Sequence, residues 1–271
     1  MKRILYVYLL PLAFIVGCST MEKEIDIELP EHKPQLVVEC YLEQGRKFQA
    51  TVLESSSYFD APNPPLVPDA EVYITYRGQR TKLNYSPGTN SRNNRFYTHT
   101  SVVRMSGKPG EVFGIEVTDG KGRKVTGYTT ILPQVPIQKV EWKFNNKDKA
   151  LVLTTFQDDE TSQNFYRYMT HRNKLENGPQ RTFVSDDNLT NGKSTSYGSA
   201  YDYEAGDTLI LSLYHIEQQY YDFLRSTDDA KNANGNPFAQ PSKVKSSVQG
   251  GIGIFTNLAF DRKNVILTKE D

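Results

Sequence analysis

Cysteine is scarce in this 271-residue chain, which contains only Cys18 and Cys40. Cys18 follows an apolar run near the amino-terminal end, and Cys40 lies within the apolar stretch QLVVECYL. If Cys18 is modified, no intramolecular disulfide can form, so the fold must be stabilised by its hydrophobic core. We interpret Cys40 as a small buried residue and not as a reactive thiol.

An excess of charge is also missing, since 32 Lys and Arg side chains stand against 32 Asp and Glu side chains. Without residues 1–17, which include Lys2 and Arg3, 30 basic side chains face 32 acidic ones, a net charge of −2. Nucleic-acid-binding domains usually present a basic surface. The balance therefore argues against nucleic acid as a partner.

No apolar run is long enough to span a bilayer. The run from Ile4 to Val16 is broken only by Pro11 and follows Lys2 and Arg3. It has about 13 residues, whereas a membrane-spanning helix needs roughly 18 or more. The pattern is typical of the core of a signal peptide.

The residues Ile15-Val16-Gly17-Cys18 resemble the bacterial lipobox, in which the cysteine sulfur receives diacylglycerol and the signal is cut just before it. We therefore predict a signal peptide over residues 1–17 and a lipidated tether over residues 18–33. The alternative is a conventional signal peptide that happens to end at a cysteine. Several acyl chains hold a protein firmly on a membrane, because each buried methylene contributes about 0.8 kcal/mol.

The residues after the predicted lipid site bear on location. Ser19 stands where aspartate would resemble an inner-membrane retention signal, so transfer to the outer membrane is allowed. Glu22 and Glu24 loosely resemble the acidic export signals of surface lipoproteins in Bacteroidota, although any solvated tether contains charged residues. We expect a lipid-anchored protein of the outer membrane at the cell surface. An anchor in the periplasmic leaflet is the alternative.

Stretches that favour helix are few, and 17 Tyr with 13 Phe favour β structure. Alternating runs over residues 34–132 predict an immunoglobulin-like sandwich of seven strands. Pro133 and Pro136 predict a boundary, and residues 137–271 predict a second β-rich domain. Helical spacing of apolar residues predicts one short helix at about 216–228.

Motifs of the common enzyme classes are missing. The sequence has no Gly-x-Ser-x-Gly elbow, and its four histidines occur in separate elements without metal-ligand spacing. We therefore expect no catalytic residue, metal or cofactor, although a calcium site at Asp158 to Glu160 stays open as an alternative to solvated turn residues. Gly250, Gly251 and Gly253 lead into a strand instead of a helix, so they predict a bulge or close backbone approach and not a phosphate loop.

Three stretches carry a family resemblance: QLVVECYLEQG, SSSYFDAPNPPLVPDAEVYI and YYDFLRSTDDAKNANGNPFAQPSKVKSSVQGGIGIF. They are similar to Bacteroidota outer-membrane lipoproteins of the DUF4249-like family, whose function is uncharacterised. Genes of this family are usually found beside those of TonB-dependent transporters. The resemblance implies an accessory or docking subunit of such a transporter, which is not an enzyme, and supplies no catalytic residue.

Aromatic residues are the remaining candidates for contact with a partner or ligand. Tyr197, Tyr201 and Tyr203 could stack on sugar rings, which supports the alternative of a freestanding surface adhesin or glycan-binding lipoprotein. More commonly, tyrosines in such a pattern are half-buried residues of ordinary strands. Phe238 lies between Pro237 and Pro241 in the loop after the predicted helix. We expect residues 216–241 to face a partner, unless the helix plugs the β-domain and Phe238 packs beside it.

Overall fold

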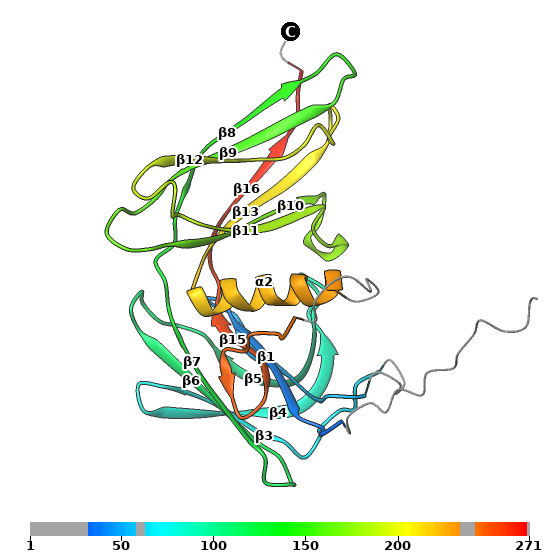
Figure 1. Ribbon diagram of the computed structural model, residues 1–271, viewed down its shortest axis with the longest axis vertical. Coiled ribbons are helices and arrows are strands. Elements are labelled where there is room, and N and C mark those ends of the chain that lie inside the picture. Colours follow the sequence, from blue (N-terminus) through cyan, green and yellow to red (C-terminus); the bar gives the residue numbers. More distant parts are fainter. Residues whose placement is uncertain (1–31, 58–62, 234–241, 270–271) are drawn as a thin grey trace, which may run out of the picture. The chain divides into compact units, whose positions relative to one another are not determined.

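The computed structural model describes residues 32–57, 63–233 and 242–269, and these residues from Pro34 onward form one compact unit. Seven strands occupy the first half: β1 (Leu36–Leu42), β2 (Lys47–Glu54), β3 (Glu71–Tyr76), β4 (Gln79–Thr89), β5 (Phe96–Arg104), β6 (Val112–Thr118) and β7 (Lys124–Thr130). The second half contains β8 (Ile137–Phe144), β9 (Ala150–Gln157), β10 (Phe165–Arg172), the short 3-10 helix η2 (Leu175–Asn177), β11 (Arg181–Asp186), β12 (Ser194–Gly198), β13 (Thr208–Ile216), α2 (Gln218–Ala233), β14 (Val248–Gln249), β15 (Ile252–Asn257) and β16 (Ala259–Ile266). The predicted mainly β architecture, with seven strands between residues 34 and 132, is confirmed (Figure 1).

The first sandwich is one continuous series of strands folded into two layers, in the order β14-β7-β6-β3-β4-β5-β2-β1-β15. Strand β4 belongs to both layers, because its first half pairs with β3 and its second half pairs with β5. The β4–β5 register is irregular between Tyr85 and Gly88. An irregularity of this kind bends a strand, which lets the series turn back on itself.

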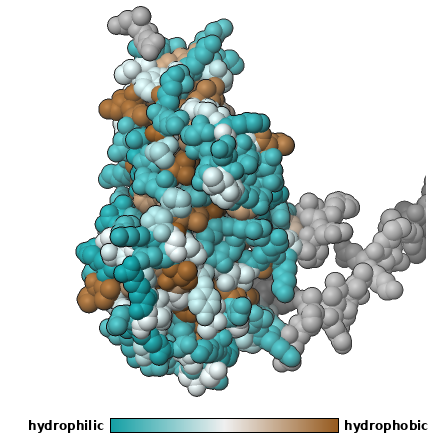
Figure 2. Space-filling view, turned by 90° about the vertical axis from the view of Figure 1, so that its left-hand side faces the viewer, coloured by the Kyte–Doolittle hydropathy of each residue, from teal (hydrophilic) through white to brown (hydrophobic). Residues whose placement is uncertain are grey.

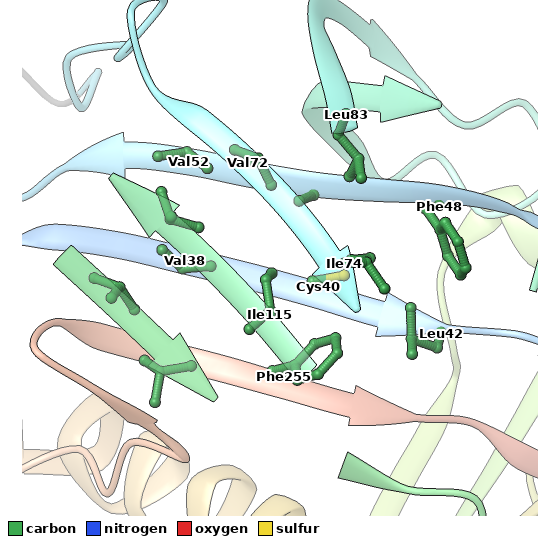
Figure 3. Close-up of a cluster of buried hydrophobic side chains, with 14 of the residues drawn as sticks. Val38, Cys40, Leu42, Phe48, Val52, Val72, Ile74, Leu83, Ile115 and Phe255 are labelled. Atoms are coloured by element: carbon green, nitrogen blue, oxygen red, sulfur yellow. The ribbon is translucent and has the colours of Figure 1, made fainter. Parts of the chain in front are cut away.

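Alternate residues of these strands fill the core between the layers. In β1 the buried positions are Leu36, Val38, Cys40 and Leu42. Figure 3 shows side chains from β1 meeting those from strands of the opposite layer, with Cys40 among them. Burial raises the pKa of the Cys40 thiol to about 12, so this cysteine is a core residue as predicted.

Residues 248–257 add an edge strand to each layer. Strand β14 pairs antiparallel with β7, and β15 pairs in parallel with β1 from Val37 and Ile252 onward. Gly253 has a φ of 136°, and a Cβ atom there would lie 1.9 Å from the carbonyl oxygen of Val38. The predicted close backbone approach of the glycine segment is confirmed.

This arrangement differs from the predicted division into residues 34–132 and 137–271. Pro133 and Pro136 do lie between β7 and β8, but residues 248–257 complete the first sandwich instead of the second. The Glu217 side chain also accepts a hydrogen bond from the backbone N–H of Thr130, at 2.9 Å. The residues around Pro133 and Pro136 do not show which distant strands pair with one another. For this reason the two prolines alone suggested two separate regions.

The second sandwich packs a four-stranded sheet, β11-β10-β13-β16, against a three-stranded sheet, β12-β9-β8. Its core contains Tyr168, Leu209 and Leu211 from the larger sheet, with Ala150 and Val152 from the smaller one. In β10 the residues alternate, so Tyr166 and Tyr168 point into this core. The intervening residues of β10 therefore project from the opposite face of the sheet.

Helix α2 covers part of that opposite face. Tyr220 and Phe223 pack with Phe165 and Ile216 of the sheet and with Ile254 of β15. The helix begins two residues later than predicted, because Ile216 ends β13, and it continues to Ala233. Among the described helices, none is both long and apolar enough to cross a membrane.

Candidate functional site

The three candidate tyrosines do not form a common surface. Tyr203 is 1% exposed, and its hydroxyl lies 2.6 Å from the hydroxyl of Thr170. Tyr197 packs against the ring of Phe156, with centroids 5.0 Å apart, and burial raises its pKa to about 12. Tyr201 alone of the three is exposed, at 41%. A sugar ring could therefore stack on Tyr201 but not on Tyr203.

Two other candidate residues, Cys18 and Phe238, lie outside the described residues, so lipidation and partner contact at these positions stay predictions. The described part of the segment from residue 216 to 241 includes α2, whose buried residues include Tyr220, Tyr221 and Phe223. This face belongs to the core and cannot meet a partner. It agrees with the alternative in which the helix plugs the β-domain.

The acidic run at Asp158 is used within the fold. Asp158 is buried, and its carboxylate accepts hydrogen bonds from the Tyr166 hydroxyl at 2.5 Å and from the Gly192 N–H at 2.8 Å. Asp159 accepts a hydrogen bond from the Thr161 hydroxyl. Across the described ranges, no group of three or more His, Cys, Asp or Glu side chains is placed to hold a metal ion.

The face of the molecule in Figure 2 is predominantly hydrophilic, and its apolar residues lie in small separate groups. It offers no broad apolar surface of the kind that marks many protein interfaces. Polar side chains offer another guide to a site, and several of them converge in a cleft beside α2.

This cleft has a volume of about 230 Å³. On one side it is lined by the exposed face of the four-stranded sheet, where Arg167 and His171 of β10 lie with Arg262 of β16. Strand register explains the grouping: Arg167 is paired with Tyr214, and Arg262 is paired with Ser212, two positions along the same strand. Successive residues at a spacing of two share one face of a strand.

The other side of the cleft comes from the connection between β4 and β5, which contributes Arg92 and Arg95. A local turn holds this connection, because the side chain of Asn90 accepts a hydrogen bond from Arg92 N–H and that of Asn93 accepts one from Arg95 N–H. Asparagine side chains commonly stabilise turns in this way. Two arginines are thereby fixed opposite the sheet.

Positive charge exceeds negative charge in the cleft. Glu43 is the single acidic residue that lines it, and its carboxylate pairs with Arg92 at 2.8 Å. Arg95 has no such partner within the described residues; its guanidinium lies 3.7 Å from the centre of the Tyr41 ring. Tyr41 in turn meets Tyr220 of α2 edge to face, at 5.8 Å.

Arg167 and Arg262 are held by hydroxyl groups. Arg167 donates to the Tyr220 hydroxyl at 2.6 Å, and Arg262 donates to Ser212 at 2.8 Å and to the Tyr214 hydroxyl at 3.0 Å. No carboxylate of the described residues lies within ion-pair distance of either guanidinium. The two side chains are thus oriented by neutral partners, and their charges are left without a counter-charge.

His171 adds a buried polar side chain whose hydrogen-bonding atoms are not all used by the described residues. Its side chain is 4% exposed, and its Nδ1 atom has no hydrogen-bond partner within the described residues. Burial, with the nearby charges of Arg262 and Arg167, lowers the pKa of His171 to about 4. The imidazole is therefore neutral at pH 7, with one nitrogen protonated.

This arrangement suits binding better than bond breaking. Arginine forks recognise planar anionic oxygens, and a neutral imidazole can donate one further hydrogen bond. His171 makes no hydrogen bond to a hydroxyl, thiol or carboxylate of the described residues, so it is not paired with a nucleophile as in acyl-transfer enzymes.

Sequence reasoning missed the cleft because its residues come from several strands, from α2 and from connections that are far apart in the chain. One local signal was present in β10, where FYRYMTHR places Arg167, Met169 and His171 on a single face. A strand that contributes to a core on one face and carries two basic residues on the other is a reason to look for a polar site there.

The fold and the cleft define a mainly β protein of two sandwiches with an arginine-rich cleft. The chain belongs to the family described as a domain of unknown function, DUF4249, whose model matches residues 22–264. No curated protein matches the sequence.

Several solved structures resemble parts of the fold. The FN1–FN3 domains of chicken CNTN1 match with 13% identity and a TM-score of 0.28, covering 68% of this chain and 60% of that one. A cytokine receptor complex matches with 8% identity and a TM-score of 0.26, covering 68% and 86%. A DUF4785 family protein from Legionella pneumophila matches with 17% identity and a TM-score of 0.24, covering 66% and 51%. This chain thus spans less than two thirds of the length of two of them, and similarities at this level carry no argument about function.

Proposed function

We propose that this protein is a lipid-anchored, non-catalytic binding subunit at the bacterial outer membrane, associated with a TonB-dependent transporter. The lipobox at Cys18 supports the anchor, and the DUF4249 family supports the setting through the resemblance described above. The anchored chain would present its ligand-binding cleft next to the transporter.

The observation that carries the binding role is the surplus of oriented donors in the cleft. Arg167 and Arg262 are fixed by hydroxyl groups and lack carboxylate partners within the described residues. Because both side chains are held in place yet remain partly exposed, they are positioned to bind an anion that enters the cleft. The same residues provide no nucleophile and no set of metal ligands, which favours binding over catalysis.

The alternative is a freestanding surface adhesin or glycan-binding lipoprotein. Its support in the sequence was the tyrosine group, and of this group only Tyr201 is exposed. The docking role is therefore preferred. Retention of the purified protein on a glycan resin, with no transporter in the membrane extract, would instead favour the alternative.

The anchor is tested by Cys18→Ala. We expect the variant to lose incorporation of radioactive palmitate and to leave the membrane fraction, because no other run in the sequence is long enough to span a bilayer. Ser19→Ala is the matched control and should keep both properties. Persistent acyl labelling of the Cys18→Ala variant would contradict lipidation at this residue.

Association with a transporter is tested by affinity purification of the tagged wild-type protein from outer membranes solubilised in mild detergent. We expect a TonB-dependent transporter to co-purify in a fixed ratio. The Phe238→Ala variant distinguishes the two roles of the loop after α2: loss of the transporter at an unchanged thermal midpoint would place Phe238 at the contact, whereas early unfolding would place it in the core. Absence of any transporter from the wild-type sample would contradict the docking role.

A further inference from the structure

We infer that the arginine-rich cleft binds a small organic anion that carries carboxylate groups, an inference that rests on the proposed binding role and names the class of ligand. The first ground is charge. Arg95, Arg167 and Arg262 line the cleft without carboxylate partners among the described residues, and Glu43 is already paired with Arg92. A charge that is removed from water needs an opposite charge beside it, so a ligand that displaces water from these partly exposed guanidinium groups is expected to be an anion.

The second ground is the way the donors are arranged. Arg95 comes from the β4–β5 connection, whereas Arg167 and Arg262 come from the sheet on the other side. Each guanidinium is a planar fork that matches the two oxygens of a carboxylate. A ligand with carboxylates at more than one position would contact both sides of the cleft.

The third ground is His171. Its Nδ1 atom is buried and has no partner within the described residues, although it lies among the arginines of the sheet. By contrast, His215 uses both ring nitrogens, toward the Pro133 carbonyl at 2.9 Å and the Asn164 side chain at 3.1 Å. A ligand oxygen would give the His171 imidazole the hydrogen bond that it lacks.

The apolar residues of the cleft favour an organic anion over inorganic phosphate. Met169, Leu175, Pro179 and Leu258 line it together with the basic side chains. Binding sites for organic molecules combine apolar contact with a few fixed polar groups, whereas a bare phosphate ion has no carbon skeleton to use such contacts. The volume of about 230 Å³ limits the ligand to a small molecule.

Binding is measured by calorimetry on the full lipidated protein in detergent, without any transporter present. The probes are citrate, D-glucuronate, inorganic phosphate and, as a neutral control, D-glucose. We expect citrate or glucuronate to bind saturably and at least about tenfold more tightly than phosphate, because they present planar carboxylates on a carbon skeleton that fills more of the cleft. Glucose should give no saturable heat.

Variants locate the site. Arg167→Gln and Arg95→Gln, on opposite sides of the cleft, should each weaken carboxylate binding about 10- to 100-fold, as expected for loss of one charge-assisted contact. Arg172→Gln is the matched control, since Arg172 follows His171 on β10 but pairs with Asp207 at 3.0 Å outside the cleft. It should bind like the wild type. Thermal midpoints measured without ligand show whether each variant is folded, and Arg95→Gln in the β4–β5 connection keeps the test valid if Arg167→Gln unfolds.

The His171 imidazole gives a second readout. Its NMR resonances should shift on addition of the carboxylate probe, because a bound anion offsets the neighbouring guanidinium charges and raises the pKa of this side chain. The inference is overturned if no probe saturates up to about 10 mM, if phosphate binds as tightly as the organic acids, or if Arg172→Gln loses as much affinity as Arg167→Gln. The calorimetry contains no transporter, so a lack of anion binding would not contradict the docking role. Likewise, a lack of co-purification would not contradict anion binding in the cleft.

Discussion

His171 differs from the other buried histidines in how its ring nitrogens are used. His99 lies between the Thr98 hydroxyl at 2.9 Å and the Ala70 carbonyl at 3.1 Å, and His215 is likewise bonded at both nitrogens. Burial lowers the pKa of both of these residues. In His171 the pKa is lowered to about 4, by burial and by two arginines, while its Nδ1 atom has no hydrogen-bond partner in the described part of the chain.

The lowered pKa of His171 predicts a pH-dependent contribution to stability. The unfolded chain binds a proton at this residue below about pH 6.5, whereas the folded protein does so only below about pH 4. The free energy of unfolding should therefore be highest above pH 6.5 and fall as the pH decreases from 6.5 to 4. Urea unfolding of the wild type and of His171→Gln at pH 7 and pH 5 measures the difference.

The variant should show the smaller loss between these two pH values, although not a zero loss, because His99 and His215 titrate in the same direction. An equal loss in both proteins would mean that His171 is already exposed to protons in the native state. Its imidazole resonances in the wild type should also titrate near pH 4.

Among the secondary-structure elements, the edge strand β15 contains the described glycine at which an added Cβ atom would meet the closest contact. We predict that Gly253→Ala destabilises the protein by more than about 2 kcal/mol, since the new Cβ atom would lie 1.9 Å from the Val38 carbonyl oxygen and force β15 away from β1. Gly45→Ala is the matched control, because its φ of 74° is also positive but no atom lies within 4 Å. It should cost only about 1 kcal/mol.

Chemical denaturation followed by circular dichroism compares the two variants with the wild type. Similar midpoints for Gly253→Ala and Gly45→Ala would show that the β1–β15 pair tolerates separation, which would contradict the close backbone approach.

Elements with strong local patterns were predictable, and those without them were not. The seven alternating runs between residues 34 and 132 correspond to β1 to β7, because alternation of apolar and polar residues determines which face of a strand is buried. Strand β12, STSYG, was missed since it has one large apolar residue and lies at the edge of its sheet. The pairing of β15 with β1 could not be predicted, because nothing in either strand specifies a partner so distant.

The cleft was hidden for a related reason. Arg95, Arg167 and Arg262 are separated by about 70 to 95 residues in the chain, and each taken alone is an ordinary surface arginine. The proposed site rests on the lack of nearby carboxylates among the residues that the structure describes, and this depends on how distant segments meet. The composition gave no indication of a basic cleft, since the whole chain carries equal numbers of basic and acidic side chains.

For the whole molecule, the structure revises the expectation of two separately folding regions. A chain that ends at residue 136 would lack β14 and β15, leaving the edges of β7 and β1 unpaired and the space of Phe255 in the core empty. We predict that this fragment, purified without residues 1–33, fails to give a cooperative unfolding transition, because exposed strand edges also favour aggregation.

Limited proteolysis of the full protein provides the matching measurement. We expect one protected body that contains both β1 and β15, and no stable fragment that ends near Pro133 or Pro136. Recovery of separate fragments covering residues 34–132 and 137–271 would restore the division predicted from the sequence.

The parallel pair of β1 and β15 also constrains the order of folding. Val37 and Ile252 face each other across more than 200 intervening residues, so the first sandwich has a large contact order and β15 is synthesised long after β1. Until residues 248–257 emerge, β1 has a free edge. A chain with this topology should fold slowly, and a chaperone that keeps β1 unpaired until residues 248–257 are available would favour the correct pairing.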